Sequence, residues 1–158
     1  MAFNDVVYVE NTGIRFTNFA GEEGTYNPAG RRNFMLDIPE ERVEEMRGYR
    51  LNIKESKPDS EGRVQHYIKV NVNYNPPRSI PKPRITLFLD NTYTELDESE
   101  VAMLDSLDIV SVDCSFRLYK YNDAGDCSAK LSEMLVYARE SYISARRRAM
   151  IESRCAEE

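Results

Sequence analysis

Residues 65–90 constrain the fold most, because they contain two runs with the alternation of half-buried strands, joined by a proline-rich loop. In the first run Ile68, Val70 and Val72 alternate with polar residues, and a second run of the same kind spans residues 85–90. The loop between the runs holds four prolines, which cannot donate hydrogen bonds to a sheet, and its only charges are positive. This stretch therefore predicts a pair of strands with a cationic, aromatic-bearing outer surface.

Other segments show the same strand pattern. Residues 6–19 predict two short strands broken at Asn11-Thr12-Gly13, with Ile14 and Phe16 on one side of the second, and further strands are expected at 33–38, 49–53, 109–121 and 128–137. We expect Val110, like its neighbours at alternate positions, to point inward. Residues 122–126 have the composition of a hairpin turn.

Two short helices are expected between these strands. One begins at Pro39 and ends at Gly48, and the other begins at Asp97, where Glu100 completes a capping-box pattern. The tail after residue 137 has high helix propensity and is either a third helix or a mobile arm. Seven or eight short strands with two or three short helices indicate a β-rich α+β fold, for which we predict an antiparallel barrel like the oligonucleotide/oligosaccharide-binding (OB) fold.

Length and composition limit the possible functions. A chain of 158 residues is expected to form one domain, here residues 1–137, followed by a C-terminal segment, 138–158. The formal net charge of −6 means that any nucleic-acid site must depend on local positive charge. With no apolar run long enough for a membrane span and three cysteines without metal-ligand spacing, a soluble cytoplasmic protein with plain thiols is expected.

Catalytic chemistry has little support in the sequence. The single histidine, His66, has no partner in a nucleophile or metal motif, and no phosphate-binding glycine motif is present. We therefore expect no enzyme activity, no cofactor and no metal site, although acidic loops holding a divalent metal stay open as a minor alternative.

Aromatic and basic residues support binding to a single-stranded nucleic acid. Bases stack on aromatic rings while cations meet the phosphates, and either DNA or RNA fits these requirements. Outward strand positions are also ordinary sites for tyrosine and for solvated cations, so packing is the competing explanation. The expected phosphate contacts are Arg15, Arg31, Arg32, Lys69, Arg78, Lys82, Arg84, Arg117 and Lys120, and the expected stacking rings are Tyr26, Tyr67, Tyr74, Phe88, Tyr119 and Tyr121. Tyr74 has inward parity and could contribute only if its strand end splays.

A succession of short motifs resembles the single-stranded DNA-binding proteins of tailed bacteriophages and prophages. The motifs are GIRFTNFAG at 13–21, YNPAGRRNF at 26–34, VNVNY at 70–74 with Pro76-Pro77, PRITL at 83–87, Leu96-Asp97, a strand at 112–119 ending in Arg-x-Tyr, and AKLSEMLV at 129–136. The resemblance implies an OB fold that coats single-stranded DNA, in a sequence-tolerant manner, during phage replication or recombination. It also implies a tail that recruits phage or host replication proteins.

The tail departs from this pattern, because it ends in only two acids and carries an arginine triplet at 146–148. The alternative function is a protein-interaction module, for instance a phage inhibitor of host defence, that keeps the barrel but does not bind DNA. Its acidic C-terminal part would then face a basic partner.

Overall fold

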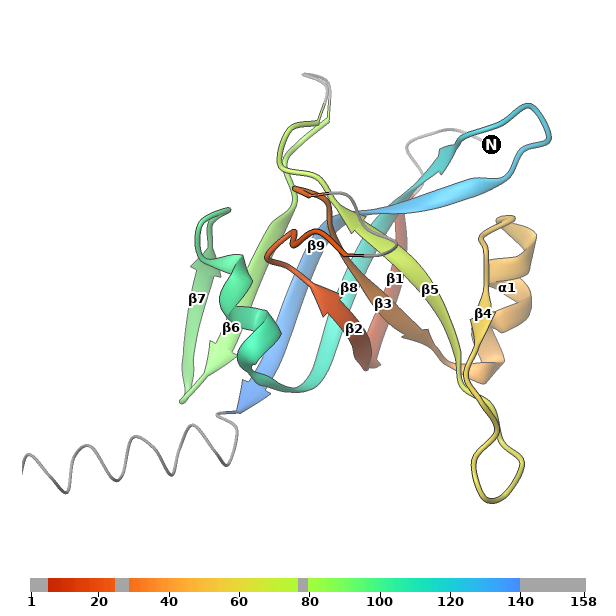
Figure 1. Cartoon of the computed structure of the whole chain (residues 1–158), viewed down its shortest axis with the longest axis horizontal. Helices are drawn as coiled ribbons and strands as arrows, with labels where there is room; N and C mark the ends of the chain where they lie inside the picture. The colour runs from red at the N-terminus through yellow and green to blue at the C-terminus, as the bar shows by residue number, and fades with distance from the viewer. Residues whose placement is uncertain (1–5, 25–28, 77–79, 140–158) are drawn as a thin grey trace, which may run out of the picture.

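The computed structural model describes residues 6–24, 29–76 and 80–139, which form one strongly curled sheet with short helices at its margins (Figure 1). The expected β-rich, OB-like fold class is confirmed. The elements in chain order are β1 (Val6–Thr12), β2 (Ile14–Asn18), β3 (Arg32–Ile38), η1 (Glu40–Arg42), α1 (Val43–Gly48), β4 (Lys54–Glu55), β5 (His66–Val72), β6 (Arg84–Leu89), β7 (Thr92–Leu96), η2 (Val101–Ser106), β8 (Asp108–Lys120) and β9 (Cys127–Arg139). Among the described residues, no helix is long and apolar enough to cross a membrane.

The strands follow the path β1-β8-β9-β5-β3-β2, and β6 joins β9 and carries β7 at its other edge. The path does not close, because β1 and β2 stand at its two ends. Most neighbours are antiparallel, but β5 and β6 each run parallel to β9. The long β8–β9 hairpin therefore connects the two halves of the sheet, and its tip projects beyond them (Figure 1).

The strand pair expected within residues 65–90 is only partly correct. Both runs are strands, yet β5 and β6 do not pair with each other. The N-terminal part of β9 pairs with β5, where Val70 lies opposite Ala129. The C-terminal part of β9 pairs with β6, where Ile85 lies opposite Met134. The partner of β6 across a hairpin is β7, a strand that the sequence pattern did not reveal.

The inward positions of these strands form one core. Phe19, Phe34 and Phe116 are fully buried, with aliphatic residues from every long strand around them. Val110, expected inside, is instead 59% exposed. The register of β8 on β9 shifts between Ile109 and Ser111, and such a bulge reverses the side on which preceding residues lie.

The helix expected at Asp97 begins later, as the 3-10 helix η2 at Val101, and the expected reciprocal bonds between Asp97 and Glu100 form in the turn before it. The Asp97 carboxylate accepts the Glu100 backbone N–H at 3.0 Å, and the Glu100 carboxylate accepts that of Asp97 at 3.1 Å. Asp105 then accepts the backbone N–H groups of Phe19 (2.9 Å) and Ala20 (3.0 Å). This carboxylate attaches η2 to the segment that follows β2. The expected helix at 39–48 is present as η1 and α1.

Tyr74 gives a testable consequence of this packing. Its side chain is 6% exposed, and its hydroxyl is buried without a hydrogen-bond partner among the described residues. Burial raises the pKa of Tyr74 to about 12, against a smaller opposing effect of Arg32. We expect Tyr74→Phe to raise the free energy of unfolding by ~1 kcal/mol, because a buried unsatisfied hydroxyl is removed. Denaturant titration measures this change, with exposed Tyr121→Phe as the control.

The pH dependence of the free energy of unfolding, compared between the unchanged protein and Tyr74→Phe, is a second readout. Since the pKa of folded Tyr74 lies above the ordinary value of 10, its contribution to stability is complete below pH 10 and is lost as the pH rises through 12. That loss should be absent from Tyr74→Phe. A destabilised Phe variant would show that the hydroxyl has a partner.

Candidate nucleic-acid interface

One row of residues crosses the outer face of five adjacent strands. Asn33 on β3 lies opposite Asn71 on β5, Asn71 opposite Lys130 on β9, Lys130 opposite Arg117 on β8, and Arg117 opposite Val6 on β1. The residues next to them in sequence, such as Val70, Ala129 and Leu118, point to the other side of the sheet and belong to the core. The row therefore lies on the face of the sheet that points away from the core.

Positive charge on this face is not neutralised by nearby acids. In the described part of the chain, Lys69, Arg117 and Lys130 form no ion pair, and Lys130 places its ammonium 4.3 Å from the centre of the Tyr119 ring. Such a cation–π contact holds the ring and the charge together. We call this surface the cationic face and define it by Lys69, Asn71, Arg117, Tyr119 and Lys130.

The proline-rich loop borders the cationic face. A small hollow is lined by Pro76, Pro81 and Pro83 from that loop and by Arg117, Tyr119 and Lys130 from the hairpin. The Nε of Arg117 is buried there without a hydrogen-bond partner among the described residues. Arg117 and Lys130 thus place two cations without an acid partner among the described residues beside this hollow, an arrangement suited to binding phosphate.

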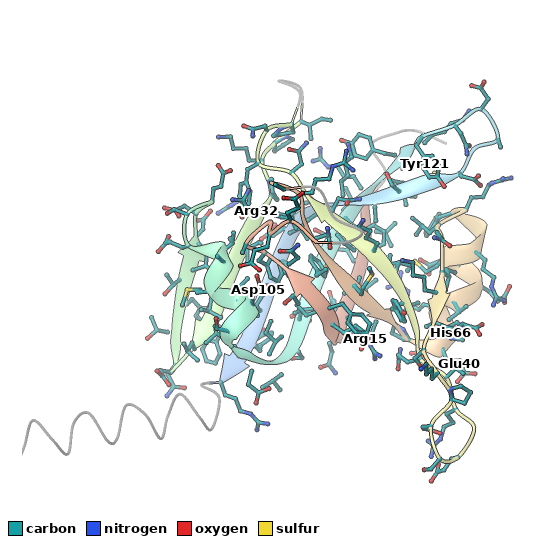
Figure 2. The ribbon with its side chains drawn as sticks, viewed as in Figure 1. Arg15, Arg32, Glu40, His66, Asp105 and Tyr121 are labelled. Atoms are coloured by element: carbon teal, nitrogen blue, oxygen red, sulfur yellow. The ribbon has the colours of Figure 1, made fainter. Side chains whose placement is uncertain are left out.

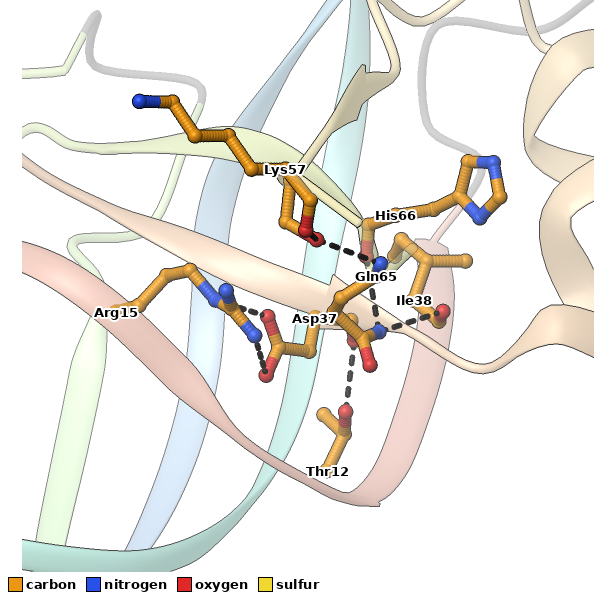
Figure 3. A network of polar contacts seen from close by, with 8 residues as sticks. Thr12, Arg15, Asp37, Ile38, Lys57, Gln65 and His66 are labelled. Carbon is orange, nitrogen blue, oxygen red and sulfur yellow. Dashed lines mark hydrogen bonds and ion pairs between the residues drawn. The ribbon is translucent and has the colours of Figure 1, made fainter. Parts of the chain in front are cut away.

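A second cluster, on β2 and β5, extends the face. Arg15 forms a two-point ion pair with Asp37, with Nε–Oδ1 at 2.7 Å and Nη2–Oδ2 at 3.1 Å (Figure 3). The Arg15 guanidinium also lies 5.5 Å from the Tyr67 ring centre. Gly13 allows this arrangement, since a Cβ there would lie 2.9 Å from Asp37 Oδ2. Arg15, expected to meet phosphate, has its charge matched by Asp37 and contacts the Tyr67 ring.

Phe16 is an aromatic residue of this cluster that the alternation pattern placed on the wrong side. It is 69% exposed, and its ring meets Tyr67 edge-on at 6.1 Å. Its φ of 49° is left-handed, an uncommon conformation for a bulky residue, and the register of β2 on β3 shifts nearby, between Arg15 and Asn18. The irregular backbone turns the ring outward, and no sequence signal marks it.

Lys130, like Asn71, is missing from the expected set, although the sequence contains a signal for it. Ala129 and Leu131 are inward positions, so Lys130 must point outward. The hairpin turn at 122–126 then fixes the register, which sets Tyr119 opposite Ser128 and Arg117 opposite Lys130.

Several expected contacts lie elsewhere. Arg32 pairs with Glu98 and Arg84 with Glu95, while Lys82 lines a hollow with these glutamates and Asp97. Two of the expected stacking rings, Tyr74 and Phe88, also lie away from the cationic face. Tyr74 is buried under Arg32, whose guanidinium is 5.5 Å from its ring centre, and Phe88 packs on Tyr93 and Tyr137 away from the cationic face.

The remaining expected residues lie at the periphery. Arg31 is exposed just before β3, and Tyr121 is 62% exposed at the β8–β9 turn. Lys120 is exposed on the opposite side of that ribbon from Tyr119. Figure 2 shows Arg15, Arg32 and Tyr121 on well-separated parts of the surface. Tyr26 and Arg78 lie outside the described residues.

Within the described residues, no three histidine, cysteine or acidic side chains gather as a metal site. His66 lies 3.2 Å from Glu55, at the margin of an open hollow beside the β4–β5 connection, as a strand residue would. Cys114 and Cys127 are buried free thiols, and burial raises the pKa of Cys114 far above its ordinary value.

Phe16→Gly separates binding from stability. Glycine accepts a left-handed φ that costs a bulky residue roughly 1 kcal/mol, so we expect the free energy of unfolding to be held or slightly raised. Loss of the ring should weaken oligonucleotide binding by about 1–3 kcal/mol if one base stacks there. Thermal unfolding and fluorescence anisotropy measure the two effects. Normal binding by this variant would remove Phe16 from the interface.

Comparisons with known proteins identify the family of this chain. A family model described as "Putative phage ssDNA-binding domain" matches residues 3–157. No curated protein sequence matches the chain. Similar solved structures include the single-stranded DNA-binding protein from bacteriophage Enc34 (13% identity, TM-score 0.49, covering 86% of this chain and 82% of that one) and the same protein in complex with ssDNA (12%, 0.48, 86% and 88%).

Proposed function

Because the chain belongs to the phage single-stranded DNA-binding family, we propose that its cationic face, together with Tyr67 and Phe16, is the surface that holds the strand. The observation that carries this proposal is the row of Asn71, Lys130 and Arg117 across β5, β9 and β8. In an acidic protein, this row collects cations that no described acid neutralises.

Each part of the surface has a separate task. Lys69, Lys130 and Arg117 meet phosphates, while the rings of Tyr119, Tyr67 and Phe16 stack on bases. Stacking contributes about 1–3 kcal/mol per base and tolerates any sequence, because every base has a π-face. The amide of Asn71 donates to the Ala129 carbonyl at 3.4 Å and holds the two parallel strands together under this surface.

We propose that the protein acts by binding alone, without catalysis, and protects or organises single-stranded DNA during phage replication or recombination in the host cytoplasm. The cationic face offers charge and aromatic rings for a polymer, and the described residues hold no cluster of metal-binding side chains. Single-stranded DNA is the proposed ligand.

A salt series tests the function. The affinity for a labelled thymidine oligonucleotide should fall linearly on a logarithmic scale, with a slope of about −0.7 for each phosphate contact. Three contacts would give a slope near −2. No detectable binding at low salt would contradict the proposal and favour an interaction module that has lost DNA binding.

A further inference from the structure

Three aromatic rings form a cluster on the outer face of β6, β7 and β9, away from the cationic face. The Phe88 ring centre lies 4.6 Å from that of Tyr93 and 5.8 Å from that of Tyr137. Phe88 is opposite Tyr93 in the β6–β7 register and opposite Tyr137 in the β6–β9 register, and Tyr93 is 62% exposed. Three rings on an outer face offer an apolar docking surface.

Carboxylates flank this cluster. Glu10, Asp113 and Glu133 line one hollow together with Leu135, which lies opposite Asp113 in the β8–β9 register. Among the described residues, none of the three acids has an ion pair within 4.0 Å, while Glu133 lies opposite Arg84 in the β6–β9 register and Asp113 accepts the Asn11 backbone N–H at 2.8 Å. We call this surface the acidic aromatic face and define it by Phe88, Tyr93, Tyr137, Glu10, Asp113 and Glu133. It repels a nucleic acid and suits a cationic segment with apolar residues.

We propose that the chain's own C-terminal segment, residues 140–158, docks on the acidic aromatic face. This segment contains both required chemistries, the arginine triplet at 146–148 and the apolar Tyr142 and Ile143. It also starts at the right place, directly after Arg139 ends β9, two residues beyond Tyr137.

The distances allow this contact within one chain. Arg146 is seven residues beyond Arg139, a reach of at most ~25 Å. Asp113 lies opposite Leu135, which is four residues, or about 13 Å, back along β9 from Arg139. An extended segment therefore brings the triplet within reach of Asp113, and Tyr142 and Ile143 lie on the chain between Tyr137 and the triplet. This inference does not depend on how the protein binds DNA.

Paramagnetic NMR on the full chain tests the proposal. A nitroxide on Cys155 labels the C-terminal segment, since Cys114 and Cys127 are buried. We expect the largest loss of amide signal around Tyr93, Tyr137 and Glu133, with little loss around Lys69 and Arg117. A loss centred on the cationic face, or no localised loss, would overturn the proposal. A second sample mixes chains that carry the nitroxide but no isotope label with isotope-labelled chains that carry no nitroxide. An equal loss of amide signal in this mixture would also overturn the proposal, because the segment of a second copy would then be the occupant.

Charge reversal supplies the matched variants. Arg146→Glu, Arg147→Glu and Arg148→Glu together should abolish the localised loss, and so should Glu10→Lys with Glu133→Lys. The two sets combined should restore it, because opposite charges face each other again. Arg154→Glu is the control outside the triplet and should leave the loss in place. Loss that persists in both charge-reversed sets would contradict the proposal.

Discussion

Replacing Lys69 and Lys130 together by glutamine is expected to weaken oligonucleotide binding at least about tenfold at low salt. Both side chains are on the cationic face, and neither pairs with a described acid, so their charge is available to phosphates. Tenfold corresponds to ~1.4 kcal/mol for the two contacts. The salt slope should shrink by about 1.4, which is two contacts at ~0.7 each.

A matched control removes the same charge elsewhere. Arg47 and Arg63 already pair with neighbouring glutamates near α1 and on the β4–β5 connection. Their double replacement by glutamine should change affinity only through the overall charge and leave the salt slope nearly unchanged. Equal losses in the two double variants would mean that binding follows net charge rather than a defined surface.

Replacing Tyr67 and Tyr119 together by leucine is expected to produce the largest loss, because both rings then lose their bases. With about 1–3 kcal/mol per stacked base, the pair should lose roughly 2–6 kcal/mol. Leucine retains apolar bulk at these half-buried outer positions, so the free energy of unfolding is expected to change little. Equilibrium titration of a labelled oligonucleotide measures the effect.

Tyr93→Leu is the control for that experiment. Tyr93 is an outward strand tyrosine, 62% exposed, but it lies in the acidic aromatic face. The Tyr93→Leu variant should bind the oligonucleotide with the same affinity as the unchanged protein. If Tyr93→Leu weakened binding more than Tyr119→Leu, the strand would have been assigned to the wrong face of the sheet.

Local alternation predicted most of the elements but not their partners. Residues 65–90 contain two real strands, yet both pair with β9, a strand that follows far later in the chain. The period of two fixes which residues face the core, whereas parallel pairing depends on long-range packing. The proline-rich loop lies beside the Arg117–Tyr119 strand end, a neighbour that comes from the fold and not from local alternation.

In the candidate site too, local alternation predicted some residues, while others depend on the folded backbone. Tyr67, Lys69, Arg117 and Tyr119 were predicted from alternation and are on one continuous outer face. Phe16 could not be predicted, because its left-handed backbone and the shifted register reverse the side expected from parity. Arg32 and Arg84 could not be separated from the site by sequence alone, since their acid partners, Glu98 and Glu95, become neighbours only on folding.

Photo-crosslinking tests most directly the claim that DNA crosses the cationic face. A 5-iodouridine-substituted oligonucleotide is bound at low salt and irradiated, and mass spectrometry then locates the crosslinked aromatic residues. We predict crosslinks at Tyr119, Tyr67 and Phe16. Crosslinks confined to Phe88, Tyr93 and Tyr137 would contradict the account.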